Sequence, residues 1–130
     1  MLIGNEKCVI AIIDDEELVR TSLQRLLKMA GYTIAAFTSA EEFLKSGLLQ
    51  DVRCLIADIR MPGMSGVDLQ SQLNAEDYQI PIIFITAHGD EKMRLRAMRD
   101  GAVAFLAKPF DNSVLLDLVR TCLNVTQDEE

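Results

Sequence analysis

Four apolar runs of this sequence each end in a polar residue that could take part in chemistry. The runs cover residues 8–13, 54–57, 81–85 and 103–107. The residues that follow them are Asp14 and Asp15, Asp58, Thr86 and Lys108. Short runs rich in Ile and Val are typical of strands buried on both faces of a parallel sheet. Ligands of such sheets bind just outside the carboxyl ends of the strands, so we expect these side chains to share one edge of one sheet.

The three carboxylates predict a cation site. Like charges at close range raise one another's pKa and repel, and a hard divalent cation removes that conflict. Mg²⁺ prefers carboxylate oxygens and keeps several waters, which suits a shallow site. The alternative is that these acids only cap helices. Capping accounts well for Asp15, since Glu16 and Glu17 also favour a helix N-terminus. It does not account for Asp58, which precedes the turn residues Pro62 and Gly63.

Asp58 is the predicted nucleophile of this site. A carboxylate can attack a phosphoryl group and form an acyl phosphate. The transferred group carries negative charge on its equatorial oxygens, so cationic and hydrogen-bonding groups must surround it. Mg²⁺ and Lys108 would cover two of these oxygens, and the Thr86 hydroxyl would donate to the third. A lone lysine at a strand end is usually only a solvated residue, and its partners here favour a function.

Helical patterns separate the apolar runs and define the elements that carry the site. Between residues 18 and 30, apolar residues from Leu18 onward recur at helical spacing, and Gly31 follows as a stop. Ser39 and Glu42 fit a reciprocal capping box, and Ser65 and Asp111 are further predicted caps. We therefore predict an α/β, flavodoxin-like, doubly wound five-stranded parallel sheet with helices on both faces. Asp14 and Asp58 can share a site only if their strands are neighbours, which favours the order 2-1-3-4-5.

The bulk properties limit the class of protein. We expect one domain over residues 1–130, with a polar tail from about 125. A net charge of −7 argues against direct nucleic-acid binding by this segment. We find neither an apolar stretch long enough for a membrane span nor a secretory signal, so we predict a cytoplasmic protein. Three cysteines without CxxC spacing favour small apolar core residues over a metal or redox site.

The site residues, taken in order, resemble those of two-component response-regulator receiver domains. The similarity runs from about Val9 to Leu123. The sequences of residues 60–66 and 86–90 are most similar to receivers attached to LuxR-type helix-turn-helix output domains. The motifs are Ile13-Asp14-Asp15, Ala57 to Gly66, Ile85-Thr86-Ala87 and Lys108-Pro109-Phe110. The ordered set is specific although no single motif is.

The resemblance implies a role for each matching residue. Asp58 would accept phosphate from a phosphohistidine of a sensor histidine kinase. Asp15, Asp58 and the backbone carbonyl of Arg60 would bind Mg²⁺, with Mn²⁺ as an alternative ion, and Asp14 would act through metal-bound water. Lys108 would pair with the phosphoryl group, and its bond to Pro109 would be cis. The chain would then be no enzyme in the ordinary sense, because it would assist only its own phosphorylation and dephosphorylation.

The resemblance also implies a switch. Thr86 would move toward the phosphoryl group, and Phe105 would turn inward with it. This sequence has Phe at that position where many relatives have Tyr, which leaves a switch by ring packing rather than by a hydroxyl. Arg60 and His88 would flank the phosphoryl group and tune its lifetime; the alternative is that both are ordinary solvated loop residues.

A basic stripe marks the predicted output surface. Lys92, Arg96 and Arg99 recur at i, i+4 and i+7 within one predicted helix. Charge runs of this kind are usually a solvated helix face. In the family, this helix, the last strand and the last helix form the output face, so we predict a phosphorylation-dependent homodimer that controls transcription through an output domain.

Two other classes of function remain as alternatives. A phosphatase of the haloacid-dehalogenase type also uses an Asp nucleophile with Thr and Lys. It places two acids as DxD after the first strand, whereas Asp14 and Asp15 are adjacent here, and we find no cap insertion to enclose a substrate. A degenerate receiver that only binds proteins would lack phosphorylation residues, and all of those expected are present.

Overall fold

The computed structural model describes residues 9–87 and 91–128, with side chains described through residue 124. Strands and helices alternate along the chain, as the apolar runs predict. The elements are β1 (Val9–Ile13), α1 (Glu17–Met29), β2 (Thr33–Phe37), α2 (Ala40–Leu44), β3 (Val52–Asp58), α3 (Gly66–Ala75), β4 (Ile82–Thr86), α4 (Glu91–Arg99), β5 (Ala104–Ala107) and α5 (Asn112–Asp128).

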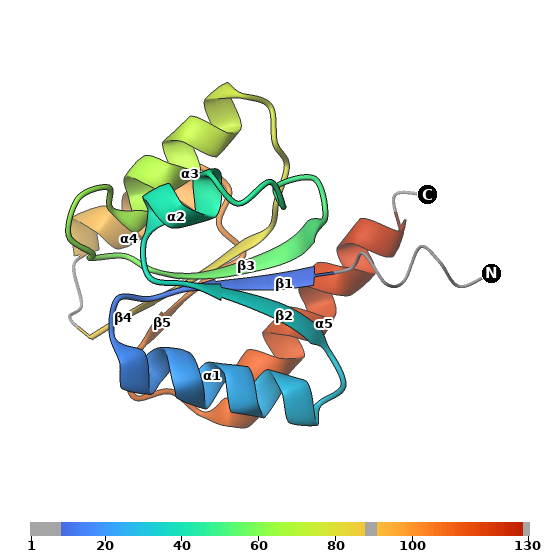
Figure 1. Cartoon of the computed structure of the whole chain (residues 1–130). Helices are drawn as coiled ribbons and strands as arrows, with labels where there is room; N and C mark the ends of the chain where they lie inside the picture. The colour runs from blue at the N-terminus through green and yellow to red at the C-terminus, as the bar shows by residue number, and fades with distance from the viewer. Residues whose placement is uncertain (1–8, 88–90, 129–130) are drawn as a thin grey trace.

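The strands form one parallel sheet in the order β2-β1-β3-β4-β5. Helices α1 and α5 cover one face, and α2, α3 and α4 cover the other (Figure 1). A parallel sheet needs a crossover after each strand, and placing the crossovers on both sides covers both faces. The predicted flavodoxin-like fold and its strand order are confirmed.

Each face of the sheet has its own core. Ala11 and Ile13 of β1 point into the core shared with α2, α3 and α4. Ile10 and Ile12 point into the core shared with α1 and α5. Successive side chains of a strand face opposite sides of the sheet, so a strand covered on both sides must be apolar throughout. This is why the central strands read as unbroken apolar runs.

Ser65 and Ser39 cap their helices, as predicted. The Ser65 hydroxyl accepts from the Asp68 amide while the Asp68 carboxylate accepts from the Ser65 amide, a reciprocal capping box. Ser39 accepts from the amide of Glu42. The predicted return bond from Glu42 to Ser39 is wrong, because the Glu42 carboxylate binds the backbone amide and hydroxyl of Thr38 instead.

The start of α1 corrects two details of the sequence-based interpretation. Its N-cap is Glu16, and within the described residues no side chain caps that end, so the capping interpretation of Asp15 is wrong. Leu18, the first residue of the expected apolar stripe, is 84% exposed. The buried stripe of α1 consists of Leu23 and Leu27.

The C-terminal helix α5 extends to Asp128, into the segment expected to be a polar tail from about 125. It packs against β3 through Leu115, Val119 and Cys122. Cys122 and Cys54 are buried free thiols, as expected for small core residues, and Cys8 lies outside the described residues. Within the described ranges, we find no helix long and apolar enough to cross a membrane.

Candidate functional site

The carboxyl ends of four strands place the candidate residues side by side. Asp58 is the last residue of β3 and Thr86 the last residue of β4. Asp14 follows β1, where its amide donates to the Phe37 carbonyl of β2 at 3.2 Å. Lys108 follows β5, where its amide donates to the Thr86 carbonyl at 2.7 Å. Parallel register therefore brings residues up to 94 positions apart to one edge of the sheet.

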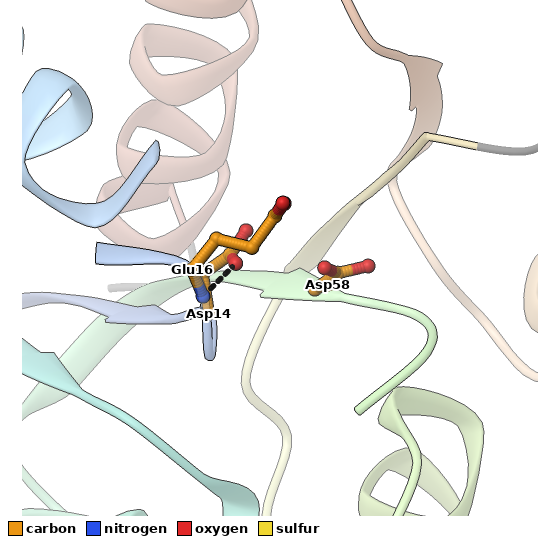
Figure 2. A group of neighbouring side chains, drawn as sticks. All are labelled: Asp14, Glu16 and Asp58. Carbon is orange, nitrogen blue, oxygen red and sulfur yellow. Dashed lines mark hydrogen bonds between the residues drawn. The ribbon is translucent and has the colours of Figure 1, made fainter. Parts of the chain in front are cut away.

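The Lys108 ammonium lies among three carboxylates. Its Nζ atom is 3.2 Å from Oδ2 of Asp14, 3.2 Å from Oδ2 of Asp58 and 3.1 Å from Oε1 of Glu16. One ligand oxygen of each acid lies within 4.8 Å of those of the other two. Figure 2 shows Asp14 and Glu16 at the end of β1 facing Asp58 at the end of β3. The charges converge on one small volume.

Burial decides the protonation equilibria of the two aspartates. Asp14 is fully buried and Asp58 nearly so. Burial raises the pKa of Asp58 above its ordinary value, more than the charge of Lys108 and the Arg60 amide lower it. Burial likewise raises the pKa of Asp14, and the nearby charge of Asp58 adds to this rise. Burial thus disfavours the charged form of both acids, and an additional cation nearby would stabilise that charged form.

For Lys108, neighbouring charges outweigh burial, whereas burial dominates for the two aspartates. Burial alone lowers the pKa of an ammonium group. Here the hydrogen bond to Glu16 and the charges of Asp14 and Asp58 outweigh that effect, and the pKa of Lys108 is raised. The lysine thus carries its positive charge throughout the neutral range.

An open hollow of about 210 Å³ adjoins the buried Asp58. Its lining residues are Asp15, Glu16, Asp58, Arg60, Thr86 and Ala87. The Asp58 carboxylate reaches it from the sheet, and Oδ1 of Asp58 also accepts from the Arg60 amide at 3.2 Å. Asp15 is exposed at the hollow rather than buried like Asp14. A small anionic group can therefore reach Asp58 from solvent.

Glu16 is a member of the site that the sequence interpretation missed. Its position in the sequence predicts only a contribution to the helix N-terminus, yet its carboxylate accepts from the Lys108 ammonium. The Glu16 amide also donates to Oδ1 of Asp14 at 2.9 Å, which turns the chain so that Glu16 points back over the strand ends (Figure 2). The signal in the sequence was a third acid directly after the Asp14-Asp15 pair. Only the turn geometry distinguishes it from Glu17.

The predicted switch and interface residues lie outside this cluster. Phe105, on β5, is half-buried and packs against the core below α4. His88 lies outside the described residues. Lys92 and Arg99 are exposed on α4, but Arg96 donates to the Ser71 hydroxyl of α3 at 3.1 Å. The Lys108–Pro109 peptide bond is cis, as predicted.

The donor set fits a hard cation. Asp14, Glu16 and Asp58 offer carboxylate oxygens, the ligand type that Mg²⁺ and Mn²⁺ prefer. Asp15 and Arg60 border the same hollow. Burial raises the pKa of two of these acids, Asp14 and Asp58, so a bound cation would offset the cost of their buried charges.

Comparisons with known proteins agree with this geometry. The family described as "Response regulator receiver domain" matches residues 10–120. Nodulation protein W of Bradyrhizobium diazoefficiens is 45% identical over 116 residues, which are 89% of this chain and 51% of that protein. The transcriptional regulatory protein FixJ of Azorhizobium caulinodans is 39% identical over 124 residues, 95% of this chain and 59% of FixJ.

A solved structure gives the same result. The response regulator StyR matches with a TM-score of 0.87 and 44% identity, over 93% of this chain and 61% of the StyR chain. The chain thus spans about half to three-fifths of the length of these relatives. With the match covering most of its length and the acidic cluster and Lys108 at the strand ends, the chain belongs to the receiver domains of two-component response regulators.

Proposed function

We propose that this chain is a Mg²⁺-dependent phosphoacceptor switch in which Asp58 takes up a phosphoryl group. The observation that carries the proposal is the Lys108 ammonium held 3.2 Å from both Asp14 and Asp58 at the tips of β1 and β3. An open hollow leads to Asp58 from solvent. A nucleophile, a fixed cation and access for a small phosphodonor therefore coincide.

The chain's own residues would divide the work of phosphoryl transfer. Asp15, Asp58 and the Arg60 carbonyl would hold Mg²⁺ directly, and Asp14 would hold it through water; Mn²⁺ would serve as well. When bound, the ion supplies charge neutralisation for the phosphoryl oxygens. Lys108 would cover another of these oxygens, and the Thr86 hydroxyl would donate to a third. His88 and Arg60 would set how easily water reaches the product.

The reaction itself is an in-line displacement at phosphorus. A carboxylate oxygen of Asp58 forms a bond to phosphorus while the bond from phosphorus to the donor's imidazole nitrogen breaks. The electron pair of the broken bond stays with the imidazole, and Asp58 becomes an acyl phosphate. Hydrolysis later returns the carboxylate and inorganic phosphate. The chain assists these two steps on itself and transforms no separate substrate.

The donor would be a phosphohistidine of a sensor histidine kinase. An apolar groove of about 450 Å³ borders Lys108 and supports docking of such a partner beside the site. Leu18, Val19 and Leu26 of α1 line it together with Pro109 and Phe110. The exposed Leu18 at this groove offers apolar surface to a helical partner. Such a kinase would place the chain in the cytoplasm.

The output would be a population shift. A phosphoryl group adds roughly −1.5 to −2 charge units and new hydrogen-bond acceptors, so it favours whichever arrangement of Thr86 and Phe105 contacts it better. We propose that this exposes a homodimer surface on α4, β5 and α5, with Lys92, Arg96 and Arg99 as candidates, and that the full protein regulates transcription. An unchanged sedimentation coefficient at high micromolar concentration, after addition of a phosphoryl mimic, would refute the dimer.

Acetyl phosphate tests the central proposal. Incubation with acetyl phosphate and Mg²⁺ should add one phosphoryl group to the intact mass of the wild-type protein. Asp58→Asn should remove this addition, and chelation of the metal should prevent it. An addition that persists in Asp58→Asn would place the acceptor elsewhere, and turnover of acetyl phosphate in large molar excess would indicate a phosphatase instead.

A further inference from the structure

Glu41 makes a contact that none of the roles above explains. This exposed residue lies on α2, and its Oε2 atom accepts from the Met64 amide at 3.0 Å. Met64 lies 23 residues later, in the loop of residues 59–65 that connects β3 to α3. The same loop begins directly after Asp58 and contains Arg60, so α2 is tied to the segment that borders the phosphoacceptor.

Gly63 lies directly beside this contact. Its φ is +79°, a left-handed conformation that side chains rarely adopt. A Cβ atom at this position would lie 2.8 Å from Oε2 of Glu41, so the Glu41 carboxylate would have to move away from it. Glycine therefore serves both the turn and the approach of the carboxylate.

Hydrogen bonds and packing hold both ends of this loop next to the site. The Ile59 amide donates to the Ile85 carbonyl at 3.0 Å, and the Gly66 amide donates to the Ile59 carbonyl at 2.9 Å. A Cβ atom at Gly66 would lie 2.5 Å from the Asp58 carbonyl oxygen. Met61 is buried in the core that also contains Phe43 of α2. Between these fixed ends, the Glu41 carboxylate holds the middle of the loop.

We propose that Glu41 is a positioning residue for the Mg²⁺-binding loop: through the Met64 amide it fixes the loop that presents the Arg60 carbonyl beside Asp58. This inference rests on the proposed function, since it concerns the affinity of that same site. Pre-ordering a ligand before the ion arrives removes an entropy cost from binding. The effect should thus appear in Mg²⁺ affinity rather than in the maximal rate of phosphorylation.

The test compares Glu41→Ala with Glu41→Gln. Alanine removes the acceptor, whereas glutamine keeps a carbonyl oxygen that can accept from the Met64 amide. Isothermal titration of the full chain with MgCl₂ should show Mg²⁺ affinity weakened about three- to fivefold in Glu41→Ala, the loss of one exposed charge-assisted hydrogen bond. Glu41→Gln should stay within about twofold of wild type. Glu17→Ala removes an exposed acid of α1 and should leave affinity unchanged.

Two further readouts separate positioning from a general loss of structure. Hydrogen exchange at the Met64 amide in metal-free protein should accelerate in Glu41→Ala while exchange in β1 and β3 does not. In Gly63→Ala combined with Glu41→Ala, the loss of affinity should be smaller than the product of the two single losses, because the same contact can be lost only once.

The outcomes distinguish this inference from the proposed function. Equal Mg²⁺ affinity in wild type and Glu41→Ala, with Asp58 still phosphorylated in both, overturns the role of Glu41 alone. Equal weakening in the Ala and Gln variants also overturns it, since charge rather than the hydrogen bond would then be responsible. Wild-type protein that neither bound Mg²⁺ nor accepted a phosphoryl group would overturn the proposed function and this inference together.

Discussion

The acidic site and the α4–β5 surface sit on the same sheet yet are built in opposite ways. At the site, Asp14, Asp58 and Thr86 are buried, although buried polar side chains are few in the described part of the chain. On the other surface, β5 is only half-buried, and α4 buries Ala97 while Leu95 and Met98 are exposed. One region hides its charges, and the other exposes its apolar groups.

The difference reflects what each region must do. Burial strengthens electrostatic interactions, so a phosphoryl group bound among desolvated charges has a large effect on its surroundings. A partner surface has to be accessible, and an edge strand with one neighbour is easier to move than a central strand with two. We therefore expect substitutions at the site to change chemistry strongly, and substitutions on α4 to change association alone.

Lys108→Ala should have the largest effect. It leaves the buried Asp14 and Asp58 without their counter-ion, and the free energy of unfolding at pH 7 should fall by about 2–3 kcal/mol. Phosphorylation by acetyl phosphate should slow by about 100-fold, because a preorganised cation at the transferring group is lost. Urea denaturation and intact-mass time courses measure the two effects. The same change at the exposed Lys92 should leave both quantities near wild type; a similar loss there would contradict the contrast between the regions.

Asp58→Asn should raise stability at neutral pH. The pKa of Asp58 is raised by burial above its ordinary value of 3.8, so between that value and the higher folded pKa the folded state binds more protons than the unfolded state. Wild-type stability should therefore fall as the pH rises through this window. The Asp58→Asn variant has no titrating group at this position, so it should not lose stability in this way. Urea midpoints between pH 4 and pH 7 in metal-free buffer should show the advantage of Asn growing with pH. A constant or shrinking advantage would mean that Lys108 compensates the buried charge fully.

Glu16→Gln should have an intermediate effect. It removes an exposed acid that binds Lys108, so it frees the lysine for the phosphoryl group and reduces repulsion of an anionic donor. Phosphorylation by acetyl phosphate should accelerate by roughly two- to fivefold, in keeping with the strength of an exposed ion pair. Glu17→Gln makes the same change in charge one residue later and should alter the rate less. Slower phosphorylation in Glu16→Gln would instead assign Glu16 to metal binding.

Leu95→Ala should have the smallest effect on the folded chain. The side chain is 55% exposed, so stability should change by no more than about 0.5 kcal/mol and phosphorylation should not change. Sedimentation of the phosphorylated protein should show weaker self-association. Leu18→Ala, on the opposite face, should spare self-association but slow phosphotransfer from a kinase. Loss of self-association in both variants would contradict the proposal that α4 carries the dimer surface.

Much of the site could be predicted because strand ends can be recognised in the sequence. Asp14, Asp58, Thr86 and Lys108 each follow an apolar run, and the rule that ligands gather at carboxyl ends is general. Glu16 could not be separated from Glu17 in this way, because a hydrogen bond from its own amide to Asp14 sets its direction. Arg96 looked like part of a free basic stripe, yet its contact with Ser71 depends on how α3 and α4 pack.

The sequence by itself determined the strand order and the acidic edge, since apolar periodicity and the need to neutralise three aspartates allow little else. Tertiary packing decided which acids are buried, which of them touch Lys108, and that Glu41 reaches Met64 across 23 residues. The reason is physical: periodicity is a property of neighbouring residues, whereas desolvation and long-range contacts exist only once distant segments have met.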